Sequence, residues 1–183
     1  TIGGVTHPVP NPFFVVATQN PIESEGVYQL PDAQRDRFMM KVVLEHPTPQ
    51  EELVILDRMA VAPPVAQQVI DLDGLIALQH KADAVFVDRS VAQYAVDLVQ
   101  ATRNPEAFGL ADLRPSIALG ASPRATINLV RGARALALIR GRTYATPQDV
   151  FDVAPEVLRH RLLLTYDALA RDITPDMIVN RIL

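Results

Sequence analysis

One stretch of the sequence does most to decide the fold, and it reads Asn20-Pro21-Ile22-Glu23-Ser24-Glu25-Gly26-Val27-Tyr28-Gln29-Leu30-Pro31-Asp32-Ala33-Gln34-Arg35-Asp36-Arg37-Phe38. An apolar run precedes it, Phe13-Phe14-Val15-Val16-Ala17-Thr18. Such a run is typical of a strand buried on both faces of a parallel sheet. Open α/β sheets bind ligands at the carboxyl ends of their strands, so Asn20 is a candidate site residue. The alternative is that Asn20 only caps a turn before Pro21.

The residues that follow this stretch continue an α/β pattern. We expect a short helix over Leu30–Arg37 and a second strand over Phe38–Leu44. Thr48-Pro49-Gln50-Glu51 has the form of a capping box with proline at the first helical position, which predicts a helix to about Met59. Residues 1–62 are therefore predicted to be the α/β part of the chain.

From residue 63 onward the pattern becomes helical, and no convincing strand is apparent. The predicted helices cover residues 73–82, 88–103, 122–141, 147–158 and 174–182. Three of them begin with the same signal, a serine or threonine followed by proline, at Ser122, Thr146 and Thr174. Residues 63–183 are thus predicted to form an all-helical domain, and the fold class is α/β followed by all-α.

Composition excludes several classes of protein. The chain is 49% hydrophobic and 21% charged, with a formal net charge of −4 and no cysteine. It has no long apolar run, signal-peptide pattern or basic region, so we expect a cytoplasmic location, no membrane span and no nucleic-acid partner. The only lysines are Lys41 and Lys81, and neither follows a glycine, so the chain has no phosphate-binding Gly-Lys-Ser/Thr loop.

Other possible sites have weaker support. The four histidines are too far apart in sequence for a local metal motif, so no metal site is predicted. Glu23 and Glu25 lie in a predicted loop, which rarely gives the fixed spacing that acid–base chemistry needs. The arginines around the 122–141 helix are predicted to line its solvated rim rather than to bind a ligand: Arg131, Arg134, Arg140 and Arg142.

The 20–38 stretch closely resembles the signature of MoxR-type AAA+ ATPases, in which Asn-Pro, a Glu-rich loop, Leu-Pro-Glu-Ala-Gln and Asp-Arg-Phe follow one another. The resemblance implies that Asn20 is the sensor 1 residue, whose amide orients the attacking water. It implies that Arg37 is the arginine finger, which reaches the nucleotide of a neighbouring subunit. Arg35 departs from the usual apolar residue and is a second candidate. Both arginines could instead pair with Asp32 and Asp36 on a solvated helix face.

A second motif, Gly120-Ala121-Ser122-Pro123-Arg124-Ala125, resembles the sensor 2 motif of MoxR proteins and of the magnesium-chelatase ATPase subunit. The resemblance implies that Arg124 contacts the γ-phosphate near a helix N-terminus, where backbone amides favour anions. It leaves open whether Arg124 acts on its own subunit's nucleotide (in cis) or on a neighbour's (in trans). The alternative is an arginine that points to water.

The resemblance extends over nearly the whole chain and implies the C-terminal portion of a AAA+ P-loop NTPase core followed by a helical lid. The full-length protein would then be an ATPase that uses ATP and Mg²⁺. It would form a homo-oligomeric ring, commonly hexameric, and act in chaperone-like remodelling, metal insertion or maturation of partner proteins. A von Willebrand factor A domain protein is the partner that the family suggests. We expect this chain to be a fragment that binds ATP weakly and hydrolyses none, with ATP and Mg²⁺ bound mainly by residues upstream of it.

Two other functions are compatible with parts of the sequence. MCM-like nucleic-acid motors share the order of sensors and finger, but they need basic hairpins that residues 1–183 do not show. A non-catalytic helical interaction module would also account for the missing phosphate loop and the helical second half.

Overall fold

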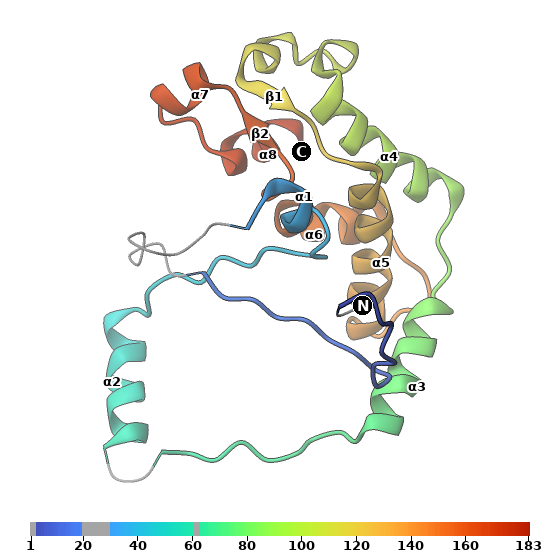
Figure 1. The fold of residues 1–183 in the computed structure, drawn as a ribbon. Helices are drawn as coiled ribbons and strands as arrows, with labels where there is room; N and C mark the ends of the chain where they lie inside the picture. Colours follow the sequence, from blue (N-terminus) through green and yellow to red (C-terminus); the bar gives the residue numbers. More distant parts are fainter. Residues whose placement is uncertain (1–2, 20–29, 61–62) are drawn as a thin grey trace.

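Most of the regular structure is helical, and most of it lies in the second half of the chain. The computed structural model describes residues 3–19, 30–60 and 63–183 (Figure 1). Its helices and strands are α1 (Asp32–Arg35), α2 (Pro49–Met59), α3 (Leu72–Asp83), α4 (Arg89–Arg103), the 3₁₀ helices η1 (Pro105–Phe108) and η2 (Ala111–Ser116), β1 (Ile117–Leu119), α5 (Pro123–Ile139), α6 (Pro147–Leu158), β2 (Leu163–Leu164), α7 (Tyr166–Ala170) and α8 (Pro175–Ile182).

The predicted helices of residues 48–183 are confirmed, and their first turns show why they begin where they do. Thr48 and Glu51 form the predicted capping box at the start of α2. The side chains of Asp88, Ser122 and Thr174 each accept a hydrogen bond from a backbone amide of the first turn. These caps satisfy amides that have no partner inside a helix. In α3 the capping residue is Asp71, so the helix begins one residue before the predicted start at residue 73.

Helix α5 is the centre of the helical body, where it packs against α3, α4 and α6. One face of α5 is fully buried along successive turns, with Ala125, Leu129, Ala133 and Ala137 at four-residue spacing. Alanines on this face let neighbouring helices approach closely, which is why α6 can lie alongside α5. All buried hydrophobic residues of the described chain lie between Val85 and Val179, so this body holds the core.

The helical half also contains a short sheet, so the expectation of no strand after residue 63 was wrong. Strands β1 and β2 pair antiparallel, with Ile117 opposite Leu164. The two strands are only three and two residues long. Alternation over so few residues cannot be recognised in a sequence.

Neither strand predicted in the first part of the chain forms a sheet in the described structure. Residues 13–18 and 38–44 have no assigned strand, and Phe14 and Leu44 are 86% and 88% exposed. A strand requires a neighbouring strand that pairs with its backbone, and residues 3–19, 30–60 and 63–183 place none beside these runs, although the amide of Lys41 donates to the carbonyl of Glu156 in α6. The apolar pattern that predicted buried strands is therefore present, but most of its side chains are exposed; Phe38 and Met40 are partly buried, and Met40 packs against the core of the helical body.

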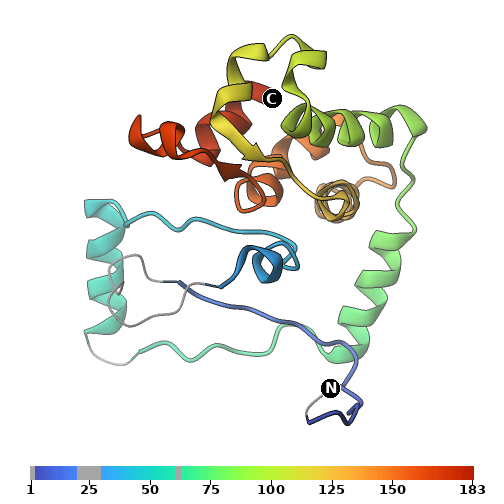
Figure 2. The same cartoon turned by 45° about the horizontal axis from the view of Figure 1, so that its top comes forward.

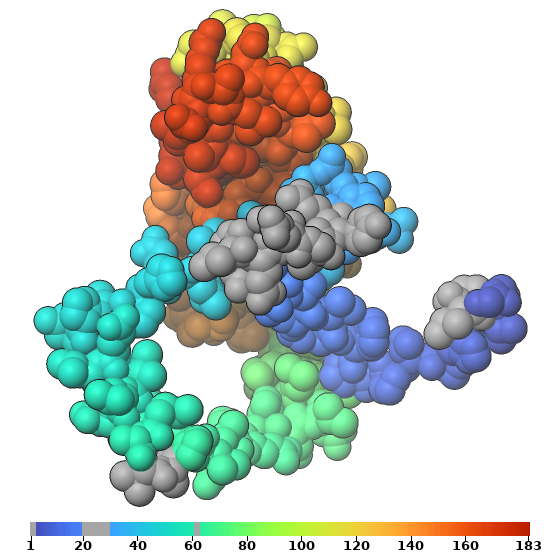
Figure 3. Space-filling view, turned by 60° about the vertical axis from the view of Figure 1, so that its left-hand side comes forward, coloured from blue at the N-terminus to red at the C-terminus, as the bar shows by residue number. Residues whose placement is uncertain are grey.

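Helix α2 lies apart from the helical body, to which extended segments connect it (Figures 1 and 2). No residue of α2 is buried, although the helix carries five exposed large apolar side chains, Leu53, Val54, Ile55, Leu56 and Met59. The space-filling view shows α2 as a separate lobe (Figure 3). Its capping box, rather than packing within the described chain, accounts for its regular start.

None of the helices in the described ranges combines the length and the apolar character that a bilayer crossing requires.

Candidate functional site

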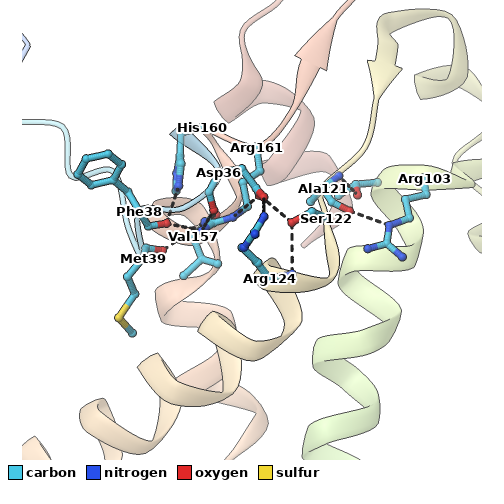
Figure 4. A network of polar contacts seen from close by, with 11 residues as sticks. Asp36, Phe38, Met39, Arg103, Ala121, Ser122, Arg124, Val157, His160 and Arg161 are labelled. Carbon is cyan, nitrogen blue, oxygen red and sulfur yellow. Dashed lines mark hydrogen bonds and ion pairs between the residues drawn. The ribbon is translucent and has the colours of Figure 1, made fainter. Parts of the chain in front are cut away.

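The carboxylate of Asp36, just after α1, joins residues from three distant parts of the chain (Figure 4). Its Oδ1 accepts a hydrogen bond of 2.7 Å from the hydroxyl of Ser122, and its Oδ2 accepts one of 2.7 Å from Nη1 of Arg124. Nε of Arg161 lies 3.3 Å from Oδ1. The start of α5 and the segment after α6 are thus both attached to the segment that carries the 20–38 signature.

The loop that presents Ser122 and Arg124 is held against the end of α4. The buried hydroxyl of Thr102 accepts a hydrogen bond from the amide of Ala121 at 2.9 Å, and Nε of Arg103 donates to the Ala121 carbonyl at 2.7 Å. A Cβ on Gly120 would lie 2.5 Å from the carbonyl oxygen of Thr102. Only glycine therefore allows this close approach of the two backbones.

Arg161 is a buried cation that binds the backbone after α1. Its side chain is fully buried, and its two terminal nitrogens donate to the carbonyls of Asp36, Phe38, Met39 and Val157. A buried guanidinium is tolerated only where its donors are satisfied and a counter-charge is near, and Asp36 supplies that charge. Burial nevertheless lowers the pKa of Arg161, while the charge of Asp36 opposes this effect.

His160 contacts the same segment. It is 8% exposed, and its Nε2 lies 3.3 Å from the carbonyl oxygen of Phe38. Burial and the charge of Arg161 lower its pKa to about 4, so the ring is neutral at pH 7 and Nε2–H can donate to Phe38. Its Nδ1 is buried and has no partner among the described residues.

The negative charge of Asp36 is stabilised by the residues around it. Burial alone would raise its pKa, but the hydrogen bonds from Ser122 and Arg124, together with the charges of Arg161 and Arg124, outweigh burial and lower the pKa. Asp36 is therefore ionised at neutral pH and acts as the anion between two arginines.

The predicted site residues differ in how far the structure describes them. Arg124 lies in the first turn of α5 and is exposed, as is Arg37. Within the described ranges no residue forms an ion pair or side-chain hydrogen bond with Arg37. Arg35, by contrast, is paired with Asp32 on α1. Asn20 lies outside the described residues.

Sequence reasoning missed four residues of this site: Asp36 as the central anion, Ser122 as its ligand, and Arg161 and His160 as the contacts to the α1 segment. Asp36 was considered only as a surface partner of Arg35 or Arg37, and Ser122 only as a helix cap within the sensor 2 motif. A signal was nonetheless present, because Arg159-His160-Arg161 places three basic side chains directly after an apolar helix. Their partners could not have been identified from spacing.

A second ionic cluster is structural. Asp149 is fully buried, and its carboxylate accepts hydrogen bonds from Arg140, Arg142 and the backbone amide of Thr146. The hydrogen bond from Arg142 is the largest cause of a strongly lowered pKa at Asp149, and burial opposes it. Arg140 and Arg142 thus connect the end of α5 to the start of α6, a more specific role than the solvated rim that was predicted.

The residues described here do not include a group of three or more acidic, histidine or cysteine side chains that could hold a metal ion. The site is instead cationic at its surface, with Arg37 and Arg124 exposed beside one largely buried carboxylate. Such an arrangement can bind an anion and bring two guanidinium groups to it.

Comparison with known proteins identifies the family of the chain. The AAA lid domain family matches residues 111–182, and the family of ATPases associated with various cellular activities (AAA) matches residues 1–40. Chaperone MoxR1 of Mycobacterium tuberculosis is 53% identical over the whole of this chain, which spans 48% of that protein. Protein MoxR of Paracoccus denitrificans is 34% identical over 90% of this chain and 52% of its own length.

A solved structure supports the fold. A protein of Cytophaga hutchinsonii described as a candidate ATPase is 40% identical and superposes with a TM-score of 0.92 over all of this chain and 56% of its own. The chain spans about half the length of the curated relatives it matches. Because the superposition covers all of this chain, the extended arrangement of its first part is shared with the longer Cytophaga protein. The fold is that of the C-terminal portion of a AAA+ core with its helical lid, and the chain belongs to the MoxR family of AAA+ ATPases.

Proposed function

We propose that the full-length protein is an ATPase in which Arg37 and Arg124 together contact the phosphates of a bound nucleotide. One observation carries the proposal: Arg124 is hydrogen-bonded to Asp36, the residue directly before Arg37. Consecutive Cα atoms are about 3.8 Å apart, so the backbones that carry the predicted finger and the predicted sensor 2 residue are held at one place.

The exposed parts of the site suit a nucleotide triphosphate. Arg124 stands at the N-terminus of a 17-residue helix, where the helix dipole favours negative charge. Arg37 is exposed, and no described residue competes for its guanidinium. The described residues contain no acidic cluster for Mg²⁺, so the metal would be held by other parts of the full-length protein.

The roles of the two arginines follow from their chemistry. When bound, ATP with Mg²⁺ supplies the phosphoryl group to be transferred and part of the neutralising charge. A guanidinium keeps its charge at any physiological pH and offers forked donors to phosphate oxygens. Arg37 and Arg124 would stabilise the charge that develops on those oxygens, and Asn20 would orient the attacking water.

The same contact favours one answer to whether Arg124 acts on its own subunit's nucleotide or on a neighbour's. An arginine finger acts on the nucleotide of the neighbouring subunit, so Arg37 must face that subunit. Arg124 is paired with Asp36, the residue before Arg37, so we expect it to lie near the same subunit interface. We propose that both arginines act in trans, on one nucleotide at the interface between two subunits.

We further propose that the full-length protein acts as a homo-oligomer with a chaperone-like function. A site shared between subunits requires a homo-oligomer, and a hexameric ring is the family's usual form. The name of the mycobacterial relative, Chaperone MoxR1, supports a chaperone-like function. Metal insertion or partner maturation, a von Willebrand factor A domain partner, a cytoplasmic location and a domain boundary after residue 62 stay predictions. The same applies to the expectation that residues 1–183 alone hydrolyse no ATP.

Steady-state ATPase assays on the assembled full-length protein test the proposal. Arg37→Ala is expected to lower kcat by about 10³-fold or more, as loss of an arginine finger does elsewhere. Arg35→Ala is the matched control, because Arg35 is two positions away but already paired with Asp32. It is expected to change kcat less than about threefold, consistent with the small contribution of a surface pair. If Arg37→Ala has no effect and Arg35→Ala abolishes turnover, the finger is Arg35; if neither substitution lowers turnover, neither arginine contacts the reacting phosphate and the role proposed for Arg37 fails.

A further inference from the structure

We infer that Asp36 is a positioning residue, which holds the guanidinium of Arg124 in the orientation that nucleotide binding requires. This inference rests on the proposed function. It assigns a role to a side chain that the sequence motifs mark only as the neighbour of Arg37.

The geometry of the contact leaves Arg124 available to a ligand. Asp36 accepts a hydrogen bond only from Nη1 of Arg124, at 2.7 Å. Nη2 and Nε donate no hydrogen bond to any residue of the described ranges, and the side chain of Arg124 is 54% exposed. One edge of the guanidinium is therefore fixed, and the other is open to an anion.

The carboxylate itself is fixed, which a positioning residue requires. The side chain of Asp36 is 17% exposed, and Ser122 and Arg124 donate hydrogen bonds to different oxygens of its carboxylate. Nε of Arg161 lies close to the same oxygen as Ser122, and Arg161 also donates hydrogen bonds to the backbone carbonyls of Asp36 and Phe38. Rotation of the carboxylate would break several contacts at once, so the direction of the Arg124 bond is set before any ligand binds.

The position of Asp36 also connects the two arginines. A movement of the backbone at Arg37 moves Asp36 and, through it, the bound edge of Arg124. The finger and the sensor are therefore expected to change position together rather than separately.

A purely structural role is the competing explanation, because Asp36 is also the counter-charge of the buried Arg161. The two roles differ in what they predict when Arg124 is absent. A residue that acts through Arg124 has no further effect on nucleotide binding once Arg124 is removed. A residue that only stabilises the fold through Arg161 has the same effect in either background.

A double-mutant cycle on the full-length oligomer separates them, with the KM for ATP, kcat and the thermal midpoint measured for each protein. Asp36→Asn, which keeps the shape but removes the charge, is expected to raise KM roughly tenfold, as the loss of a charge-assisted hydrogen bond would. In the Arg124→Ala background the same change is expected to raise KM less than about twofold. Asp32→Asn is the matched control on α1 and is expected to leave KM within about twofold of the wild type. If Asp36→Asn does not assemble, Asp36→Glu, which keeps the charge but shifts it by one methylene, replaces it in the cycle.

Two results would overturn the inference: an unchanged KM in the Asp36 variant, or effects of the two substitutions that multiply as if independent. A further result identifies a failure of the proposed function itself. If Arg124→Ala alone changes neither KM nor kcat, Arg124 does not contact nucleotide, and the positioning role of Asp36 is excluded with it.

Discussion

The buried guanidinium of Arg161 lies 3.3 Å from the carboxylate of Asp36, although 125 positions separate the two residues. This contact joins the signature segment after α1 to the helical body. The same carboxylate binds Ser122 and Arg124 at the start of α5. The structural junction between the two parts of the chain and the proposed nucleotide site therefore share one anion.

Replacing Arg161 is predicted to destabilise this junction. Arg161→Met keeps much of the side-chain volume but leaves Asp36 with one fewer cation and four backbone carbonyls without their donor. Loss of one partner of a buried pair costs about 3 kcal/mol. Urea denaturation measures the free energy of unfolding. Arg171→Met is the matched control, because Arg171 is exposed, and it should change stability by less than about 0.5 kcal/mol. Equal effects of the two substitutions would show that the Arg161 contacts are not important for stability.

His160 is predicted to make the junction sensitive to acid. Its pKa is about 4 in the folded chain and 6.5 ordinarily, so the unfolded chain binds the proton more readily. Protonation of His160 therefore favours the unfolded chain. The free energy of unfolding is unaffected by His160 above pH 6.5 and decreases as the pH falls towards 4, by about 3 kcal/mol in total. Denaturation between pH 7.5 and 4 should show this loss in the wild type. His160→Gln retains a donor for Phe38 but does not titrate, so the same loss in this variant would refute the assignment.

Gly120 is predicted to be required for the position of the α5 N-terminus. In Gly120→Ala the new Cβ would meet the Thr102 carbonyl oxygen at 2.5 Å, so the backbone must move. We expect a loss of about 2 kcal/mol or more in stability together with a raised KM for ATP. Gly132→Ala is the comparison, because its Cβ would meet only side chains, the flexible end of Met40 at 3.0 Å and Cγ2 of Val153 at 3.3 Å, and alanine favours a helix. A Gly132 variant less stable than the Gly120 variant would contradict this account.

The sequence predicted the local features of this fold well. Helix starts such as Thr48 and Ser122 were recognisable because a cap involves residues within one turn. The β1–β2 pair escaped detection because each strand is too short to show a pattern. The runs at 13–18 and 38–44 have the composition of buried strands, but no strand of the described residues pairs with them.

The site was predictable only in part. Arg37 and Arg124 were identified through motifs, whereas Asp36 and Arg161 were not identified as partners. Their contact depends on how α6 packs against α5, and charge alone does not select one pairing among the chain's 17 basic and 21 acidic residues. The roles of Asn20, Arg37 and Arg124 stay predictions, although the contacts of Asp36 give the last two a common location.

We propose that Arg37 and Arg124 of one subunit face the same nucleotide, and an oligomer assembled from two kinds of impaired subunit shows whether they do. Full-length Arg37→Ala and Arg124→Ala subunits are dissociated, mixed and reassembled, and ATPase activity is measured. If both arginines act in trans, every interface in the mixed oligomer lacks one of them, and activity stays at the level of the separate variants. Mixing either variant with Asn20→Ala subunits is the positive control and should restore part of the activity, because the sensor 1 role proposed for Asn20 concerns its own subunit's nucleotide. Recovery of activity in the Arg37→Ala and Arg124→Ala mixture would place the two arginines on different nucleotides and contradict the account.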